Sequence, residues 1–278
     1  MSEVKDRLRA LQRQVGRTPE AASTATHLVS ELRRLIGRRE RARQELAAPA
    51  GIEIADGLYA VERRWPSTKI GHVSLPWGDA EPVARERLVC FDTETTGLAG
   101  GVGTKAFMIG WGRWQGGEFV VRIIYLTKMA GEAAMLRTFT QGLPDAPIFI
   151  GYNSRSYDAP LLKGRYRMHR QEHPFAEHRH VDLLHPTRRR YRGVYENCRL
   201  QTIERHVLGI VRDDDLPGSE APGAWLAFLR GQSSVNLGRV LEHNRQDVLT
   251  VGRLLNLLCE SEERPSPKTS EKILCFGK

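Results

Sequence analysis

Apolar residues in the first 47 positions recur with the spacing of a helix. They fall three or four residues apart with arginines between them, at Val4, Leu8, Leu11 and Val15 and then at Leu28, Leu32 and Leu35. This period places apolar side chains on one face of an α-helix. Gly16 and Pro19 interrupt it, so we predict two helices in residues 1–47. Residues 47–51 then indicate a linker, and residues 1–50 are assigned to a basic helical extension.

Residues 51–86 show a weaker pattern. Two short apolar stretches, at residues 58–61 and 72–75, have strand character, but Pro66, Pro76 and Pro82 interrupt the segment. We therefore predict an irregular, β-rich lead-in over residues 51–86.

From residue 87 the apolar runs become regular, and short runs that predict buried strands alternate with segments of helical spacing. The predicted strands are residues 88–91, 106–111, 119–126, 147–152 and 181–184, and the predicted helices are residues 130–143, 159–168 and most of the chain after 184. This order predicts an α/β domain over residues 87–260, with a mixed five-stranded sheet flanked by helices. The charged residues 261–278, which contain two prolines, predict a disordered tail.

Composition narrows the class of protein. No apolar run approaches the roughly 18 residues of a membrane helix, and the N-terminus carries charges where a secretion signal has an apolar stretch. The four cysteines form no Cys-x-x-Cys pair, which argues against a zinc ribbon and a disulfide framework. We expect a cytoplasmic protein with reduced thiols and no membrane partner.

The chain is basic, with a formal net charge of +9 and an isoelectric point near 9.6. Residues 1–50 hold 11 Lys and Arg against 6 Asp and Glu, and residues 163–206 hold 11 against 5. Clustered positive charge suits a polyanion, because each neutralised phosphate releases counterions. Residues 188–192, RRRYR, add a ring on which a base can stack, although a solvated helix face has the same composition. We expect nucleic acid as the partner, and the N-terminal helices would contact it or a partner protein.

Two acids stand at the end of a predicted strand. Asp92 and Glu94 follow the apolar residues 88–91 and are two positions apart, so both point to one face of the sheet. Like charges this close repel one another unless cations neutralise them. Carboxylate oxygens are ligands for Mg²⁺ and Mn²⁺, although surface strands also carry such pairs.

Further acids lie at the edges of other predicted elements. Asp158 follows a predicted strand at the start of a helix, where an N-cap before Pro160 is an alternative role. His243 and Asp247 are four residues apart, on one face of a helix. Four acids and a base are the groups that two divalent ions, about 3.5–4 Å apart, need to hydrolyse a phosphodiester. We therefore predict that the four acids hold two Mg²⁺ or Mn²⁺ ions and that His243 takes a proton from the attacking water.

These residues resemble motifs of the DEDD superfamily of 3′–5′ exonucleases, and in particular of the bacterial YprB-type RNase H-like proteins. Residues 92–98, DTETTGL, look like the first exonuclease motif, residues 151–158 like the second and residues 243–247 like the third. The YprB-type pattern is matched specifically by residues 100–107, 180–184, 198–204 and 212–218. The resemblance covers residues 87–258.

The resemblance implies an RNase H-like fold and a two-metal 3′–5′ exonuclease acting on single-stranded DNA or RNA. One spacing departs from the superfamily pattern: the base there is usually a His five residues before the last acid, or a Tyr four residues before it, whereas His243 stands at the Tyr spacing. The candidate substrate contacts are Thr95, Thr96, Gly97, Leu98, Asn153, Tyr157, Arg189 and Arg190.

Other readings stay open at this point. A nucleic-acid-binding adaptor could keep the fold with little catalysis, although it would not need four acids. An endonuclease acting on structured substrates would use the same groups. Histidines at positions 169, 173, 178, 180 and 185 could form a second metal site, but such clusters more often make a polar surface. We expect His180 and Asp182 to orient the rim of the active site.

Overall fold

The computed structural model describes residues 50–75, 77, 81–97 and 103–262. The helices predicted in residues 1–47 lie outside this part of the chain, as does most of the predicted tail. Residues 261 and 262 are not tail, because they end the last helix.

The described chain is built on a mixed sheet of seven strands in the order β1-β2-β7-β6-β5-β8-β9. The strands are β1 (Ile52–Ala55), β2 (Leu58–Pro66), β5 (Leu88–Thr95), β6 (Ala106–Gln115), β7 (Glu118–Leu126), β8 (Ile148–Gly151) and β9 (His180–Asp182), and β3 (His72–Val73) pairs separately with β4 (Val83–Ala84). The helices are α3 (Glu132–Gln141), α4 (Asp158–Met168), α5 (Leu184–Tyr191), α6 (Leu200–Ile203), α7 (Ala221–Leu229) and α8 (Val235–Glu262). Short turns of helix are η1 (Arg85–Arg87), η2 (Met129–Gly131), η3 (Glu204–Leu208) and η4 (Gly218–Glu220), of which η3 is π-helical.

The predicted α/β class, a mixed sheet flanked by helices, is confirmed, but the sheet has two more strands than predicted. β1 and β2 come from the segment that we predicted as an irregular lead-in. β2 pairs antiparallel with β7 along its whole length, from Leu58 opposite Leu126 to Pro66 opposite Glu118. The second half of β2 is charged and mostly exposed, so its sequence lacks the apolar alternation by which strands are recognised.

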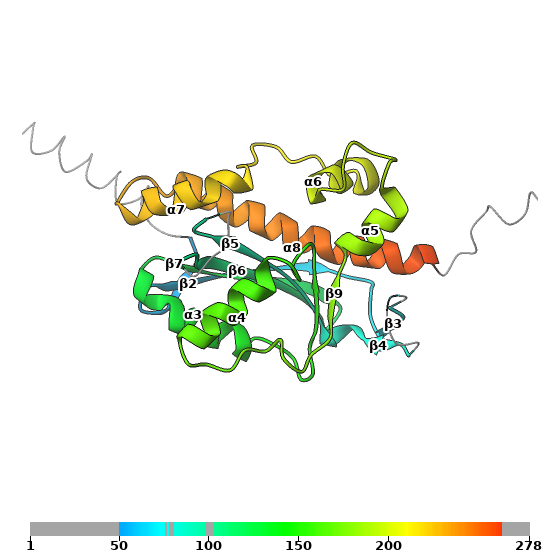
Figure 1. The fold of residues 1–278 in the computed structure, drawn as a ribbon, viewed down its shortest axis with the longest axis horizontal. Helices are drawn as coiled ribbons and strands as arrows, with labels where there is room; N and C mark the ends of the chain where they lie inside the picture. Colours follow the sequence, from blue (N-terminus) through cyan, green and yellow to red (C-terminus); the bar gives the residue numbers. More distant parts are fainter. Residues whose placement is uncertain (1–49, 76, 78–80, 98–102, 263–278) are drawn as a thin grey trace, which may run out of the picture. The chain divides into compact units, whose positions relative to one another are not determined.

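Helices cover both faces of the sheet (Figure 1). α3 and α4 lie on one face, and α5 to α8 lie on the other, with α8 running across β5, β6 and β7. Aromatic residues fill the layer beneath β5, where Phe91 packs edge-on against Phe149 with ring centroids 5.7 Å apart. On the other side Trp225 of α7 stacks on Phe107 at 4.9 Å. These contacts fix β5 in the centre of the molecule.

Glycines on β6 let α8 come close to the sheet. A Cβ at Gly110 would lie 2.0 Å from Oδ1 of Asn244, and one at Gly112 would lie 2.9 Å from a methyl of Val248. Both distances are shorter than real contacts, so larger residues would push the helix away. Since Gly110 pairs with Asp92, the same close approach brings α8 to the acidic end of β5. No described helix is long and apolar enough to cross a membrane.

Candidate active site

The first two acids lie on the central strand. β5 has β6 on one side and β8 on the other, and Asp92 and Glu94 are separated on it by Thr93. Because side chains alternate along a strand, the two acids share the face that α8 covers. Asn244 of α8 donates a hydrogen bond from Nδ2 to Oδ2 of Asp92 at 2.8 Å.

Asp158 reaches the site from the other side of β5. It is the first residue of α4, and the N-cap residue Tyr157 makes no side-chain cap. The Asp158 carboxylate accepts a short hydrogen bond from the Thr93 hydroxyl. It therefore faces β5, which the N-cap alternative does not explain.

Asp247 and His243 enter from α8. Nε2 of His243 lies 3.6 Å from Oδ2 of Asp247, so the two side chains share one face of the helix. Oδ1 of Asp247 is ion-paired with Arg212. Both residues lie one turn apart on the stretch of α8 that contacts β5.

The four acids lie close enough to influence one another's ionisation. Burial raises the pKa of Asp92 and of Glu94 well above their ordinary values, and repulsion from Asp247 and Asp158 raises both pKa values further. Burial also raises the pKa of Asp158, to about 6, although the hydrogen bond from Thr93 works against it. Carboxylates that repel one another in this way need a cation to stay ionised together.

The donor set suits a hard divalent cation. Four carboxylates supply only oxygen ligands, which Mg²⁺ and Mn²⁺ prefer. Within the described residues no three His, Cys, Asp or Glu side chains already surround a single point in the manner of a metal site. Asp92, Asp158 and Asp247 each accept a hydrogen bond from a neighbouring side chain, namely Asn244, Thr93 and Arg212.

A cavity of about 350 Å³ opens beside the acids. It is lined by Asp92, Thr93, Thr95, Gly97, Thr104, Tyr152, Asn153, Tyr157, Asp158 and Leu161. Of the predicted substrate contacts, Thr95, Gly97, Asn153 and Tyr157 therefore line it. Thr96 instead accepts a hydrogen bond from the backbone of Lys105, and Leu98 lies outside the described residues.

The wall of this cavity is fixed by Asp182. Its carboxylate accepts hydrogen bonds from the backbone N–H of Asn153 at 2.7 Å and of Arg155 at 3.0 Å. These bonds hold Asn153 in a left-handed conformation, with φ of 61°. Nε2 of His180 lies 2.8 Å from the hydroxyl of Ser154. His180 and Asp182 thus support the loop before Asp158, at the rim where we expected them.

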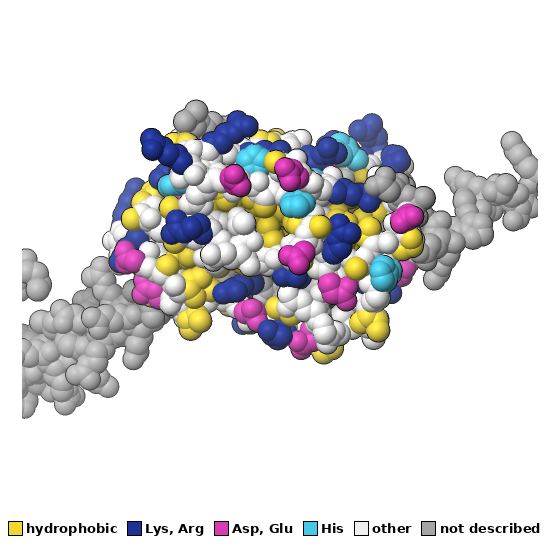
Figure 2. Space-filling view, turned by 90° about the horizontal axis from the view of Figure 1, so that it is seen from below, with side chains coloured by type: hydrophobic (Ala, Val, Ile, Leu, Met, Phe, Trp, Pro, Cys, Tyr) yellow, Lys and Arg dark blue, Asp and Glu magenta, His cyan; other side chains and the backbone are white. Residues whose placement is uncertain are grey.

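Arg189 and Arg190 lie elsewhere. Both are exposed on α5 and line neither the cavity nor the acid cluster. The guanidinium of Arg190 lies 5.6 Å from the ring centre of Tyr191. α5 leads toward residue 198, whose carbonyl accepts a hydrogen bond from the hydroxyl of Tyr152 in the cavity wall. Figure 2 shows the opposite side of the molecule, where α3 and α4 lie, with basic and acidic side chains interspersed.

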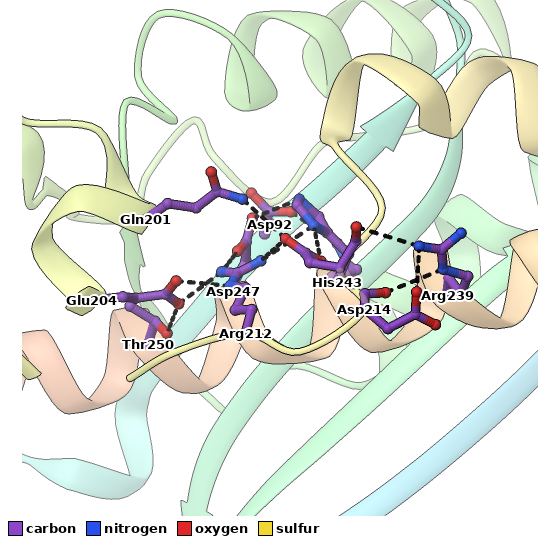
Figure 3. A network of polar contacts seen from close by, with 11 residues as sticks. Asp92, Gln201, Glu204, Arg212, Asp214, Arg239, His243, Asp247 and Thr250 are labelled. Atoms are coloured by element: carbon purple, nitrogen blue, oxygen red, sulfur yellow. Dashed lines mark hydrogen bonds and ion pairs between the residues drawn. The ribbon is translucent and has the colours of Figure 1, made fainter. Parts of the chain in front are cut away.

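Sequence reasoning missed a network of polar residues behind the acids (Figure 3). It consists of Gln201, Glu204, Arg212, Asp215, Asn244 and Thr250, which contact one another or the predicted site residues. The sequence held one signal for Gln201, Glu204, Arg212 and Asp215: residues 198–204 and 212–218 match the YprB-type pattern. That match assigned no role to any of them.

Asp215 determines which nitrogen of His243 faces the site. Nδ1 lies 2.8 Å from Oδ1 of Asp215 and 3.2 Å from Nη1 of Arg212. Nδ1 cannot donate to the carboxylate and accept from the guanidinium at once. The shorter contact to the charged acceptor favours Nδ1–H, as in other carboxylate–histidine pairs. Nε2 then keeps its lone pair on the side of Asp247.

Two comparisons bear on this site. A sequence model of the RNase H superfamily matches residues 89–259. A protein of Bacillus subtilis (strain 168), described as uncharacterized protein YprB, is 34% identical over 202 residues, which cover 70% of this chain and 48% of that protein. The chain thus spans about half the length of the curated relative it matches.

Proposed function

The chain belongs to the RNase H superfamily, and from this premise we propose that it is a metal-dependent nuclease whose catalytic acids are Asp92, Glu94, Asp158 and Asp247. The observation that carries the proposal is that Asp92 and Glu94 lie close enough to Asp158 and Asp247 for those charges to raise their pKa values, and that Asp92 and Asp158 line a cavity of about 350 Å³. Arg212 pairs with one of the four acids, Asp247, and a bound cation would offset the repulsion that remains.

We propose that the four acids hold two Mg²⁺ or Mn²⁺ ions. When bound, such a pair activates water and stabilises the leaving oxygen of a phosphodiester. The residues of the chain supply the rest. Asn244 orients Asp92 by a hydrogen bond of 2.8 Å, and the Asp215 carboxylate fixes the His243 imidazole so that Nε2 faces the site. His243 then removes the proton of the attacking water at Nε2.

The substrate we propose is the 3′ end of a single strand of DNA or RNA. The cavity of about 350 Å³ is lined by the end of β5, by residues of the connections after β5 and after β8, and by the start of α4, and we propose that it receives one terminal nucleotide. Tyr157, 62% exposed at the cavity, offers a ring on which the terminal base can stack. Asn153 and Thr95 offer polar groups to the sugar and phosphate. Removal of one terminal nucleotide at a time is 3′–5′ exonuclease activity.

End-labelled single strands incubated with Mn²⁺ or Mg²⁺ test this function. We expect a ladder that shortens from the 3′ end, and no cleavage by the variants Asp92→Asn and Glu94→Gln. Asp145→Asn is the matched control, since Asp145 is exposed and lines a different cavity. Internal cuts would make the protein an endonuclease. Binding without cleavage at any metal concentration would make it an adaptor.

A further inference from the structure

Arg212 is a charged residue at the site that no motif singled out by itself. It lies in the connection between η3 and η4, and its side chain is 9% exposed. Nε and Nη2 donate to the two oxygens of Glu204, both at 2.7 Å. This paired geometry fixes the plane of the guanidinium as well as its position.

The anchor of Arg212 is itself fixed. Glu204 is 1% exposed and begins the π-helical turn η3, a local distortion that is frequent at functional sites. Its Oε1 also accepts a hydrogen bond from the hydroxyl of Thr250 on α8. Glu204 therefore ties Arg212 to the helix that carries Asp247 and His243.

The remaining N–H groups of Arg212 point at the site. Nη2 donates to Oδ1 of Asp247. Nη1 lies 3.4 Å from Oδ2 of Asp215, the carboxylate that holds His243. One guanidinium thus contacts Asp247, a proposed metal ligand (Figure 3), and Asp215, the partner of the proposed base.

We propose that Arg212 is a positioning residue that orients Asp247 for the metal and His243 for the water, with Glu204 as its fixed support. The inference rests on the proposed function, because it takes Asp247 as a metal ligand. If only its charge mattered, Arg212 would weaken the binding of a metal ion, since two nearby cations repel each other. The geometry favours orientation, because Glu204 pairs with Arg212 through both oxygens and so offsets part of its charge while it fixes its plane. Partners that orient metal ligands typically contribute about 10- to 100-fold in metal affinity or activity.

The test needs a variant that does not leave Glu204 buried and unpaired, because such a group destabilises the fold. Glu204→Gln together with Arg212→Gln replaces the ion pair by two amides that can bond to each other. Arg205→Gln together with Glu196→Gln is the matched control, since that ion pair lies on the same segment but is 59% and 48% exposed. Thermal unfolding of both double variants checks that they fold.

The first readout is the affinity for Mn²⁺ in the absence of substrate. We expect the Glu204/Arg212 double variant to bind Mn²⁺ about 10- to 100-fold more weakly, with no change in the control. Arg212→Lys keeps the charge but loses the planar, paired contact with both oxygens of Glu204, so it should lose affinity as well. Unchanged affinity would reduce Arg212 to a structural role. Tighter binding, or full affinity in Arg212→Lys, would mean that charge matters and orientation does not.

The second readout separates this inference from the proposed function. The nitrogen chemical shifts of the His243 ring in the metal-free protein report which nitrogen carries the proton. We expect Nδ1–H in the native protein, where Asp215 accepts from it, and a mixture of tautomers in the Glu204/Arg212 double variant, because Asp215 loses its contact with Arg212. Native protein that binds no Mn²⁺ would refute the proposed metal site, while the ring signals would still test Arg212. An unchanged tautomer in the double variant would overturn the positioning role.

Discussion

Asn244 of α8 packs against Gly110 of β6 and fills the space that a side chain on Gly110 would need. Its Nδ2 donates to Asp92 at 2.8 Å, and its Oδ1 occupies the space where a Cβ on Gly110 would come within 2.0 Å. The hydrogen bond that orients the first acid therefore depends on a glycine in the neighbouring strand.

Gly110→Ala should disturb both the fold and the site. The added methyl forces Asn244 and α8 outward, and overpacking of this kind costs about 1–3 kcal/mol. We expect a lower free energy of unfolding in urea and weaker Mn²⁺ binding, since Asp92 loses its partner. Gly238→Ala in α8 is the control, because no atom lies within 4 Å of its Cβ. Equal effects in the two variants would contradict the close approach.

Asp158 should destabilise the metal-free protein at neutral pH. Its pKa is raised from 3.8 to about 6, so above pH 6 the folded state holds a charge that the unfolded state accommodates more easily. As the pH falls below 6, the folded state takes up the proton first and the penalty disappears. Asp158→Asn should thus exceed the native protein in stability by up to roughly 3 kcal/mol at pH 7.5, and not at pH 4.

Urea unfolding in the presence of a chelator measures this difference. Mg²⁺ at a saturating concentration should remove it, because the cation neutralises the carboxylate in the native protein and finds no complete site in the variant. An advantage of Asp158→Asn that persists at pH 4 would refute the raised pKa as its cause.

His180 should make the fold acid-sensitive. Burial lowers its pKa from 6.5 to about 4, so between these values the unfolded state binds a proton that the folded state does not. The free energy of unfolding should fall as the pH drops from 6.5 to 4, by up to roughly 3 kcal/mol from this residue. His180→Gln should lose less stability over this range than the native protein. The exposed His185→Gln should follow the native curve, and equal slopes for both variants would exclude His180 as the source.

His243 should contribute more to the rate of cleavage than to the affinity for Mn²⁺. If its Nε2 is the base, His243→Ala should slow cleavage about 10²–10⁴-fold while Mn²⁺ affinity stays within a few-fold. Asp247→Asn should lose more, because it also removes a metal ligand. Asp215→Asn should resemble His243→Ala in direction, since it replaces the charged acceptor that fixes the ring by a neutral amide. A rate loss below about tenfold in His243→Ala would show that metal-bound water ionises without it.

The exposed arginines of α5 should bind the part of the strand outside the cavity. Arg189→Gln with Arg190→Gln should flatten the dependence of single-strand affinity on salt, by about 0.7 in the log–log slope for each phosphate that is no longer neutralised. Arg137→Gln with Arg170→Gln is the control on the other face, where charges of both signs are interspersed (Figure 2). Equal slopes in the two double variants would remove α5 from the substrate path.

Much of the site could be predicted because its acids stand at the boundaries of regular elements. Asp92 and Glu94 end an apolar strand and Asp158 begins a helix, and such boundaries are visible as changes of hydrophobic period. Asp247 was predicted because it lies four residues after His243, on the same face of a helix. Each of these signals is local in sequence.

The remaining features are not local. Arg212 meets Asp247 across 35 residues and Glu204 meets Thr250 across 46, so no period links them. The π-helical turn that presents Glu204 breaks the helical spacing that would have placed it. The second half of β2 was missed because Glu62, Arg63 and Arg64 interrupt the apolar pattern that predicted strand character at residues 58–61, and its pairing depends on β7.

The two sides of the site should differ in the free energy needed to expose their backbone amides to solvent. Asp92 and Glu94 pair with β6 beneath α8, and the pairing of β5 with β8 ends before them, at Cys90. We expect their amides to exchange with solvent more slowly than those of the loop before α4. Asn153 and Tyr157 belong to a loop between β8 and α4, and Tyr157 is 62% exposed, so we expect this loop to open at a lower free energy than the strand. In the proposed nuclease this difference would keep the acids in place while the wall that receives each nucleotide moves.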